Sequence, residues 1–149
     1  MRVLVTGGCG FVGSAVVRLA VERGDHVLNL DRRKKNAPVP ALGPATQREG
    51  YARLEADVTD RAMIKAILRE FSPDAVIHLA ACGDDDPNAL VDAEIGGAFA
   101  VIEAARQYYE RLQGETRKRF RIVHLERAEG DIPEKLTRAQ AARGAAAVL

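Results

Sequence analysis

The residues most able to support chemistry lie near the amino end of the chain, where glycines follow a short apolar run. Gly7, Gly10 and Gly13 separate that run from a stretch with helical apolar spacing. Gly7 lets the chain reverse after a strand, Gly10 lets backbone approach a pyrophosphate, and Gly13 lets helix and strand pack closely. The helix would then point its first N–H groups at the phosphates. These residues predict a strand, a glycine turn and a helix that together bind a dinucleotide.

An acidic residue stands where such a site needs one. Asp31 follows Gly13 by 18 residues and closes a second apolar run, Val27 to Leu30. A carboxylate at about this distance hydrogen-bonds the adenosine ribose hydroxyls of a bound dinucleotide. A glycine turn without a ligand would not account for Asp31. Because a carboxylate repels a 2′-phosphate, the sequence favours NAD over NADP as the cofactor.

The residues after Asp31 allow more than one interpretation. Arg32 begins a run of basic residues that ends at Lys35. Their side chains could bind a 2′-phosphate or stack on adenine. The simpler interpretation is a solvated part of a long loop, because the stretch from Arg32 to Gly50 inclusive contains three prolines and two glycines.

Length and composition restrict the class of protein. The 149 residues predict one domain, 1–149, which can bury roughly two-thirds of the surface of its unfolded state. The net charge is +1 and the basic residues are dispersed, so no nucleic-acid partner is expected. Cys9 and Cys82 have neither a disulfide nor a metal spacing, which is typical of a reducing, cytoplasmic location. The first apolar run is too short for a leader or a membrane span, so no membrane partner is expected.

Apolar runs alternate with helical periodicity along the chain, which is typical of a parallel sheet covered on both faces. Thr59-Asp60 is expected to cap a helix that Ser72-Pro73 ends, and Asp86-Pro87 to begin a long helix. Helical composition resumes at about Glu134, and 117–119 is expected to be an exposed turn. The strands are expected at 3–5, 27–30, 51–55, 75–79 and 120–125.

Several motifs together resemble the extended short-chain dehydrogenase/reductase family, and within it the dTDP-glucose 4,6-dehydratases. The resemblance covers Met1 to about Phe120. It implies an α/β fold, a Rossmann-type doubly wound parallel sheet of about five strands in the order 3-2-1-4-5, with NAD as cofactor. The motifs are Val-Thr-Gly-Gly-Cys-Gly-Phe-Val-Gly-Ser at 5–14, Asn-Leu-Asp at 29–31, Ala-Asp-Val-Thr-Asp at 56–60, Pro-Asp-Ala-Val-Ile-His-Leu-Ala-Ala at 73–81, and Gly97 with Glu-Ala-Ala-Arg at 103–106.

The resemblance also implies which residues contact the cofactor. The amides of Phe11 and Val12 would meet the pyrophosphate, and Asp31 would hold the adenosine ribose. Asp57 and Val58, after the third strand, would bracket the adenine. Leu79, Ala80 and Ala81, where the fourth strand ends, would line the inner side of the cofactor. The full set of expected cofactor-binding residues is Gly7, Gly10, Phe11, Val12, Gly13, Asp31, Arg32, Asp57, Val58, Leu79, Ala80 and Ala81.

The catalytic part of the family pattern is not retained. The family uses a tyrosine base whose pKa is lowered by a lysine four residues later. The tyrosines here are Tyr51, Tyr108 and Tyr109, and none has a lysine at that spacing. The dehydratases' Ser-Thr-Asp-Glu-Val-Tyr-Gly-Asp segment corresponds to Glu-Arg-Ala-Glu-Gly-Asp at 126–131, and the sugar-binding C-terminal part is missing. We therefore expect no catalytic residue, no substrate-binding domain and a C-terminally truncated chain.

Two other features are interpreted without chemistry. Cys82 has no histidine close behind it that would favour a nucleophilic role. Asp84 to Asp86 are consecutive loop acids, which usually lack the converging geometry of a cation site, so no metal is expected.

Two functions therefore stay open. The favoured one is an NAD(H)-binding, dehydratase-like module without the Tyr/Lys and Asp/Glu chemistry, non-catalytic or regulatory, with a protein partner conceivable. The alternative is an NAD-dependent sugar-nucleotide oxidoreductase or dehydratase whose site is completed by a partner chain, or an enzyme whose reduced pocket acts on a small substrate by direct hydride transfer. It would need a proton donor such as Glu94, Glu126 or Glu129, with its pKa raised by burial.

The resemblance also leads us to predict a homodimer, because extended family members commonly pair two helices across a two-fold axis. The corresponding helices would be 88–112 and 134–149. Small residues at helical spacing permit close helix approach. We expect such stripes to face the partner, while Ile95, Phe99 and Ile102 face the parent sheet. The stripes are Leu90, Ala93, Gly97, Val101, Ala104 and Tyr108 in the first helix and Ala141, Ala145 and Val148 in the second.

Overall fold

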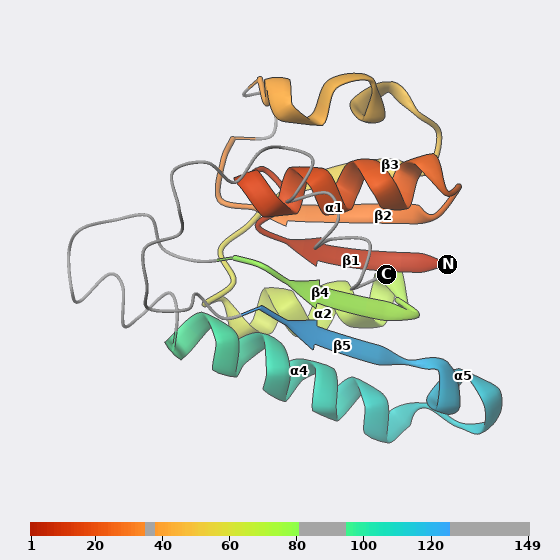
Figure 1. The fold of residues 1–149 in the computed structure, drawn as a ribbon. Coiled ribbons are helices and arrows are strands. Elements are labelled where there is room, and N and C mark those ends of the chain that lie inside the picture. The colour runs from red at the N-terminus through yellow and green to blue at the C-terminus, as the bar shows by residue number, and fades with distance from the viewer. Residues whose placement is uncertain (35–37, 81–94, 126–149) are drawn as a thin grey trace.

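The fold is known from a computed structural model, which describes residues 1–34, 38–80 and 95–125. Within this part of the chain, five strands form one sheet in the order β3-β2-β1-β4-β5, and every neighbouring pair is parallel (Figure 1). The predicted α/β class and strand order are confirmed. The strands are β1 (Arg2–Thr6), β2 (His26–Asp31), β3 (Tyr51–Glu55), β4 (Ala75–His78) and β5 (Arg121–His124).

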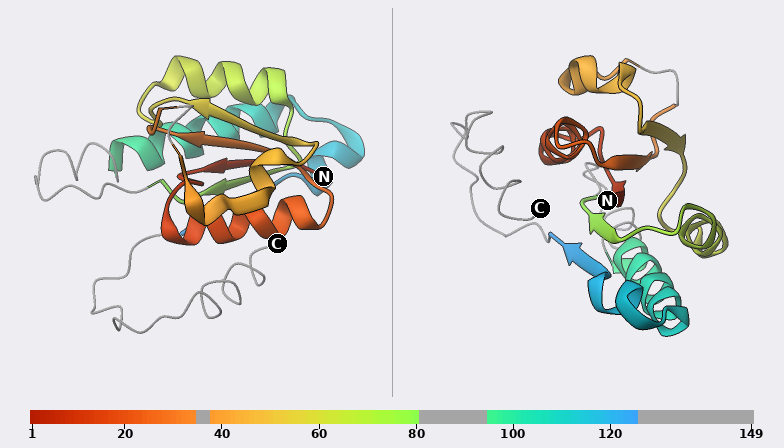
Figure 2. Two further views of the ribbon diagram at one scale, coloured as in Figure 1. Left: turned by 90° about the horizontal axis from the view of Figure 1, so that it is seen from above. Right: turned by 90° about the vertical axis from the view of Figure 1, so that its right-hand side faces the viewer.

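Helices cover the two faces of this sheet (Figure 2). α1 (Phe11–Glu22) and the 3-10 segment η1 (Pro40–Gln47) pack on one face, while α2 (Arg61–Phe71) and α4 (Gly97–Arg111) pack on the other. Side chains that alternate along β1 divide between two buried clusters, with Val3 and Val5 on the α1 face and Leu4 on the α2 and α4 face. The strands are apolar on both sides because both faces are covered.

Local signals fix the ends of α2 as the sequence predicts. Asp60 is the N-cap, and its carboxylate accepts a hydrogen bond from the backbone N–H of Met63 at 3.0 Å. Ser72 ends the helix in the left-handed conformation, at φ 47°, and Pro73 follows. Strand β4 then begins at Ala75. The buried side of α2 packs against the sheet.

Two segments expected to be irregular contain helical turns. The expected loop between Arg32 and Gly50 holds η1, whose Leu42 and Ala45 are buried in the cluster beneath α1. The expected turn at 117–119 belongs to the short helix α5 (Gly114–Arg119). Packing of Leu42 gives the first segment a structure that its proline and glycine content did not indicate.

The orientation expected for the long helix is wrong. Val101, Ala104 and Gly97 are buried against the sheet and α2, whereas Ile95 and Phe99 are 67% and 55% exposed. Ile102 is also exposed. The small residues therefore face the parent sheet, and the large apolar residues face outward. The predicted start of this helix at Asp86-Pro87 and the predicted tail helix lie outside the described residues.

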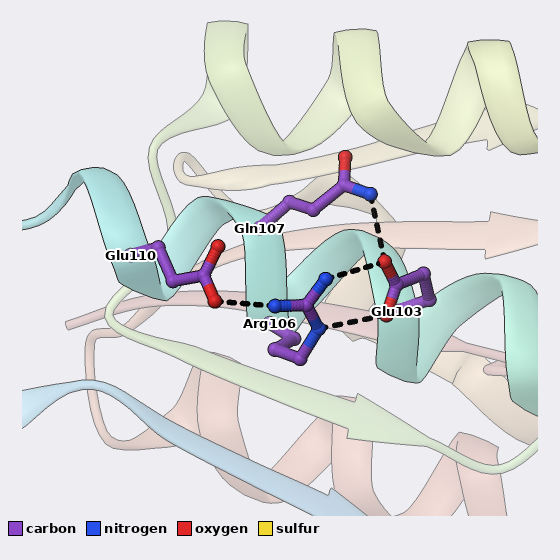
Figure 3. A network of polar contacts seen from close by, with 4 residues as sticks. All are labelled: Glu103, Arg106, Gln107 and Glu110. Carbon is purple, nitrogen blue, oxygen red and sulfur yellow. Dashed lines mark hydrogen bonds and ion pairs between the residues drawn. The ribbon is translucent and has the colours of Figure 1, made fainter.

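Helix α4 also carries a polar network, made by Glu103, Arg106, Gln107 and Glu110 (Figure 3). Arg106 forms ion pairs with Glu103 and Glu110, and Gln107 Nε2 donates to Glu103 Oε1 at 2.8 Å. Hydrogen bonds from Arg106 hold the pKa of Glu103 at about 2. These charges are thus paired within the helix itself.

Within the described ranges, no helix combines the length and apolar character needed to span a bilayer.

Candidate functional site

The residues expected to contact a cofactor come from four strands that end at one edge of the sheet. The glycine turn follows β1, Asp31 ends β2, Asp57 and Val58 follow β3, and Leu79 follows β4. Because the strands are parallel, their carboxyl ends lie together (Figure 1). In doubly wound folds, ligands bind in the crevice outside this edge. Ala81 lies outside the described residues.

Close backbone approaches explain the glycines of the turn. Gly7 has φ +72°, and a Cβ there would lie 2.7 Å from the Cα of Ala80. A Cβ on Gly13 would lie 2.1 Å from the carbonyl oxygen of Gly7, so this glycine packs on the turn itself. Gly8, which the sequence pattern did not single out, is equally constrained, since its Cβ would lie 2.3 Å from Asn29 Oδ1. Only the position of Asn29 in space reveals that requirement.

The first turn of α1 is free to bind an anion. Gly10 is its N-cap and has no side chain to accept from the first N–H groups. The carbonyl of Gly10 accepts the backbone N–H of Ser14 at 2.9 Å, which is the first helical hydrogen bond. The N–H groups of Phe11 and Val12 lie before it, and no acidic side chain occupies the first turn. This helix end therefore presents N–H donors and a partial positive charge.

Asp31 is held at the glycine turn by backbone donors. Its Oδ2 accepts the N–H of Cys9 at 2.9 Å, and its Oδ1 accepts the N–H of Arg33 at 3.0 Å. The side chain is only partly buried. Each carboxylate oxygen has a second lone pair, so Asp31 can still accept from hydroxyl groups of a ligand.

Asp57 and Val58 form the adjoining part of the edge. The carboxylate of Asp57 accepts from the backbone N–H of Thr59 at 2.9 Å and from its hydroxyl at 2.8 Å. The backbone hydrogen bond from Thr59 is the main reason that the pKa of Asp57 lies below its usual range, and the nearby charge of Arg32 adds to the effect. Val58 is buried, whereas Asp57 and Arg32 are exposed. The carboxylate of Asp57 is thus held in its ionised form at this edge, with the charge of Arg32 nearby.

Thr6 joins the glycine turn to the end of β4. Its hydroxyl lies 2.6 Å from His78 Nδ1 and 3.3 Å from the backbone nitrogens of Leu79 and Ala80. Both Thr6 and His78 are fully buried. The ring of His78 also stacks on that of His124, with centroids 4.9 Å apart. Burial, with the neighbouring His124, lowers the pKa of His78 to about 4.

A small polar cluster lies beneath the glycine turn. The Cys9 sulfur accepts from Asn29 Nδ2 at 3.6 Å and from the Arg53 guanidinium at 3.7 Å. Asn29 Nδ2 also donates to the Tyr51 hydroxyl at 3.1 Å. Burial and the charge of Asp31 raise the pKa of the Cys9 thiol, so the thiolate needed for nucleophilic chemistry is disfavoured. These groups support the turn rather than react.

The three tyrosines, all within the described ranges, lie away from the candidate edge or beneath it. Tyr108 donates to the carbonyl of Pro73 at 3.4 Å, which places its hydroxyl at the amino end of β4. Tyr109 contacts Phe120 and Arg117 near the amino end of β5. Tyr51 is directed at Asn29 below the turn. None of the three therefore reaches the outer side of the candidate edge.

In the described ranges, no group of three or more His, Cys, Asp or Glu side chains is arranged to hold a metal ion. The acids and the cysteine that the sequence singled out near the fourth and fifth strands lie outside those ranges. They are Cys82, Asp84, Asp85, Asp86, Glu94, Glu126 and Glu129.

Comparisons with known proteins agree on one family. Residues 3–129 match the NAD dependent epimerase/dehydratase family. The chain is 38% identical over 141 residues to a dTDP-glucose 4,6-dehydratase of Shigella flexneri, covering 89% of this chain and 39% of that one. A dTDP-glucose 4,6-dehydratase of Escherichia coli K12 is 36% identical with the same coverage. The chain thus spans well under half the length of these relatives.

Solved structures give the same result for the fold. A UDP-glucose 4-epimerase from Thermus thermophilus, in complex with NAD, has a TM-score of 0.61 and 33% identity. A UDP-glucose-4-epimerase from Stenotrophomonas maltophila, with bound NAD and formylated UDP-arabinopyranose, has a TM-score of 0.62 and 30% identity. Each comparison covers 72% of this chain and 34% of the other chain.

Proposed function

Since the chain belongs to the NAD dependent epimerase/dehydratase family, we propose that the carboxyl edge of its sheet binds NAD. The observation that carries this proposal is the position of Asp31, whose carboxylate is anchored at the glycine turn by the Cys9 N–H at 2.9 Å. A ribose bound there would lie beside the pyrophosphate site. The NAD-bound structures of similar fold support the same assignment.

Each part of the cofactor has a proposed counterpart along this edge. The N–H groups of Phe11 and Val12 bind the pyrophosphate, because the uncapped start of α1 favours an anion. Asp31 accepts from the ribose hydroxyls, with Arg32 beside it. The other contacts are made by Asp57 and Val58 around the adenine and by Leu79, Ala80 and Ala81 along the inner side, while Gly7, Gly10 and Gly13 let the backbone approach.

Isothermal titration calorimetry tests this site. Asp31→Ala should weaken NAD binding by about tenfold to a hundredfold, because a hydrogen bond to a charged group is lost. The matched control is Glu70→Ala, which removes an exposed carboxylate on α2 and should leave the affinity unchanged. Equal binding by Asp31→Ala and the wild type would remove Asp31 from the site. Thermal unfolding of both variants without ligand separates this effect from a loss of stability.

We further propose that the chain by itself is a non-catalytic binding or regulatory module. No tyrosine among these 149 residues has a lysine four residues later, so these residues do not supply the base used by the family. Loss of positioned acid–base groups costs on the order of 10² to 10⁴ in rate. We expect a pure sample supplied with NAD to give no dehydration of dTDP-glucose. Turnover near the rate of a full-length relative would contradict the proposal and favour an enzyme completed by another chain.

The homodimer is also proposed, with α4 oriented as the structure has it. Ile95, Phe99, Ile102 and Tyr109 are exposed and recur at steps of 3 or 4 residues with Arg106 between them, as in a helix-pairing seam. The Arg106 guanidinium is already ion-paired with Glu103 and Glu110 on its own helix, so it keeps its partners when this face is buried. A second copy of α4 is the proposed occupant. The contribution expected from 134–149 falls on residues outside those the structure describes.

A further inference from the structure

We propose that His78 is a positioning residue of the proposed NAD site: its Nδ1 accepts the Thr6 hydroxyl proton and so orients that hydroxyl toward the backbone at the end of β4. The inference rests on the proposed function, because part of its consequence is measured as NAD affinity.

The partners of the Thr6 hydroxyl determine which nitrogen of His78 carries the proton. The backbone N–H groups of Leu79 and Ala80, each 3.3 Å from Oγ1, can only donate. A hydroxyl oxygen has two lone pairs and one proton. The two N–H groups occupy the lone pairs, so the O–H donates to Nδ1 at 2.6 Å. His78 is therefore neutral and carries its proton on Nε2.

This arrangement fixes the end of β4 against the glycine turn. Leu79 N–H is shared between the Thr6 hydroxyl and the Thr6 carbonyl, which is 3.1 Å away, whereas Ala80 N–H is bound by the hydroxyl. The same two residues lie so close to Gly7 that a Cβ there would meet both of them at 2.7 Å. A displaced hydroxyl would release the backbone that borders the turn. The position of the proposed inner wall of the NAD site thus depends on Nδ1.

The other ring nitrogen of His78, Nε2, makes no hydrogen bond within the described residues that would account for a histidine at this position. Nε2 is buried and has no hydrogen-bond partner among the described residues. An unpaired buried donor costs free energy, and an apolar side chain of similar size would avoid that cost. The ring is fully buried on the sheet, with His124 of β5 stacked on it and Thr6 of β1 at Nδ1. Among the described residues, the contact at Nδ1 is therefore the one hydrogen bond of this ring.

Long-range ¹H–¹⁵N spectra of the histidine rings test the first step in the full chain. They report which ring nitrogen is protonated and need no variant or ligand. We expect the Nε2–H tautomer for His78 at neutral pH. A proton on Nδ1, or a charged ring, would overturn the proposal whether or not the chain binds NAD.

Variants test the second step. His78→Leu removes the acceptor and should weaken NAD binding about tenfold, while the amide protons of Leu79 and Ala80 exchange faster with solvent. His78→Asn, which can offer an amide oxygen near the position of Nδ1, should restore both. His124→Asn is the matched control, because it removes the stacked ring but keeps the acceptor, and it should leave affinity and exchange unchanged. If His78→Leu does not fold, Thr6→Val against Thr6→Ser makes the same comparison.

The outcomes separate this inference from the proposed function. Unchanged affinity and unchanged amide exchange in His78→Leu or Thr6→Val would overturn the role of His78. Failure of the wild-type chain to bind NAD would contradict the proposed function instead. The tautomer and the exchange of Leu79 and Ala80 would then still decide whether Nδ1 orients the hydroxyl.

Discussion

At the scale of single residues, the buried ring of His78 makes stability depend on pH. Its pKa is lowered to about 4 from 6.5, chiefly by burial. Above pH 6.5 the ring is neutral in the folded and unfolded states, so it gives no pH dependence. Between these two values the unfolded chain binds more protons, and stability is lost as the pH falls. We expect a slope of at most about 1.4 kcal/mol per pH unit from this residue.

Urea unfolding across this pH range checks the expectation. The wild type should lose more stability on acidification than His78→Asn, which has no titrating ring at this position. His26, an exposed histidine at the start of β2, supplies the control. Replacing His26 by asparagine should leave the slope nearly as it was. Parallel pH profiles for the wild type and His78→Asn would show that His78 does not titrate as its burial implies.

Sequence reasoning singled out residues that one local motif joins, and it missed residues that are joined only by contacts between distant parts of the chain. The glycine turn and Asp31 were predicted because their spacing belongs to one strand–turn–helix unit, and the structure brings them to one edge. Thr6 and His78 are 72 residues apart in the chain, so no local pattern joins them. Gly8 is constrained by Asn29 on another strand. Contact of these residues with NAD stays a prediction.

At the scale of elements, adjacent glycines at the start of α4 are predicted to differ sharply in their tolerance of a side chain. A Cβ on Gly97 would lie 2.7 Å from Val58 Cγ2, so Gly97→Ala should destabilise the fold by about 1 to 3 kcal/mol. Gly96 has helical backbone angles and nothing within 4 Å, so Gly96→Ala should stabilise it by about 0.5 to 1 kcal/mol.

Thermal or urea unfolding of the two single variants measures this difference. Because Val58 belongs to the proposed adenine contact, Gly97→Ala should also weaken NAD binding, whereas Gly96→Ala should not. Equal stability of the two variants would mean that Val58 moves aside freely. Gly97 of α4 would then lie farther from Val58 than it does in the structure.

The same helix shows the limit of periodicity as a guide to orientation. α4 carries two stripes at helical spacing, one of small residues that includes Val101 and Ala104 and one of large residues that includes Phe99 and Ile102. Hydrophobicity alone assigns the larger residues to the sheet. The structure places the small ones there, because Gly97 and its neighbours let the helix approach Val58 and α2 closely. A periodic pattern identifies a helix but cannot rank two apolar faces.

At the scale of the whole molecule, the strand order was predicted from the family resemblance, and the rules for connections and handedness are consistent with it. Parallel strands joined by helices, with a glycine turn after the first strand, favour the order β3-β2-β1-β4-β5 that is observed. The packed η1 segment was not predictable, because Leu42 and Ala45 are buried by α1 and not by their own sequence neighbours. Global topology thus follows from simple rules more readily than the structure of one connection.

The homodimer is the prediction that depends most on the corrected orientation of α4. A charge at Val101 would test folding rather than association, because this α4 side chain is fully buried in the cluster between the helix and the sheet. The informative change is Phe99→Glu with Ile102→Glu, which puts two like charges on the outward face of each copy. We expect light scattering at micromolar concentration to give a dimer mass for the wild type and a monomer mass for this variant. Apolar burial at the interface is lost and like charges oppose one another.

A matched control keeps this test specific to the face. Met63→Glu adds a charge at an exposed apolar residue of α2 and should leave the dimer intact. Phe99 also lies under the guanidinium of Arg61, at 5.1 Å from the ring centroid, so Ile102→Glu alone shows whether that contact matters. A monomeric wild type, or a dimer that persists in Phe99→Glu with Ile102→Glu, would exclude this face. If Met63→Glu also dissociates the dimer, the interface includes α2 as well as α4.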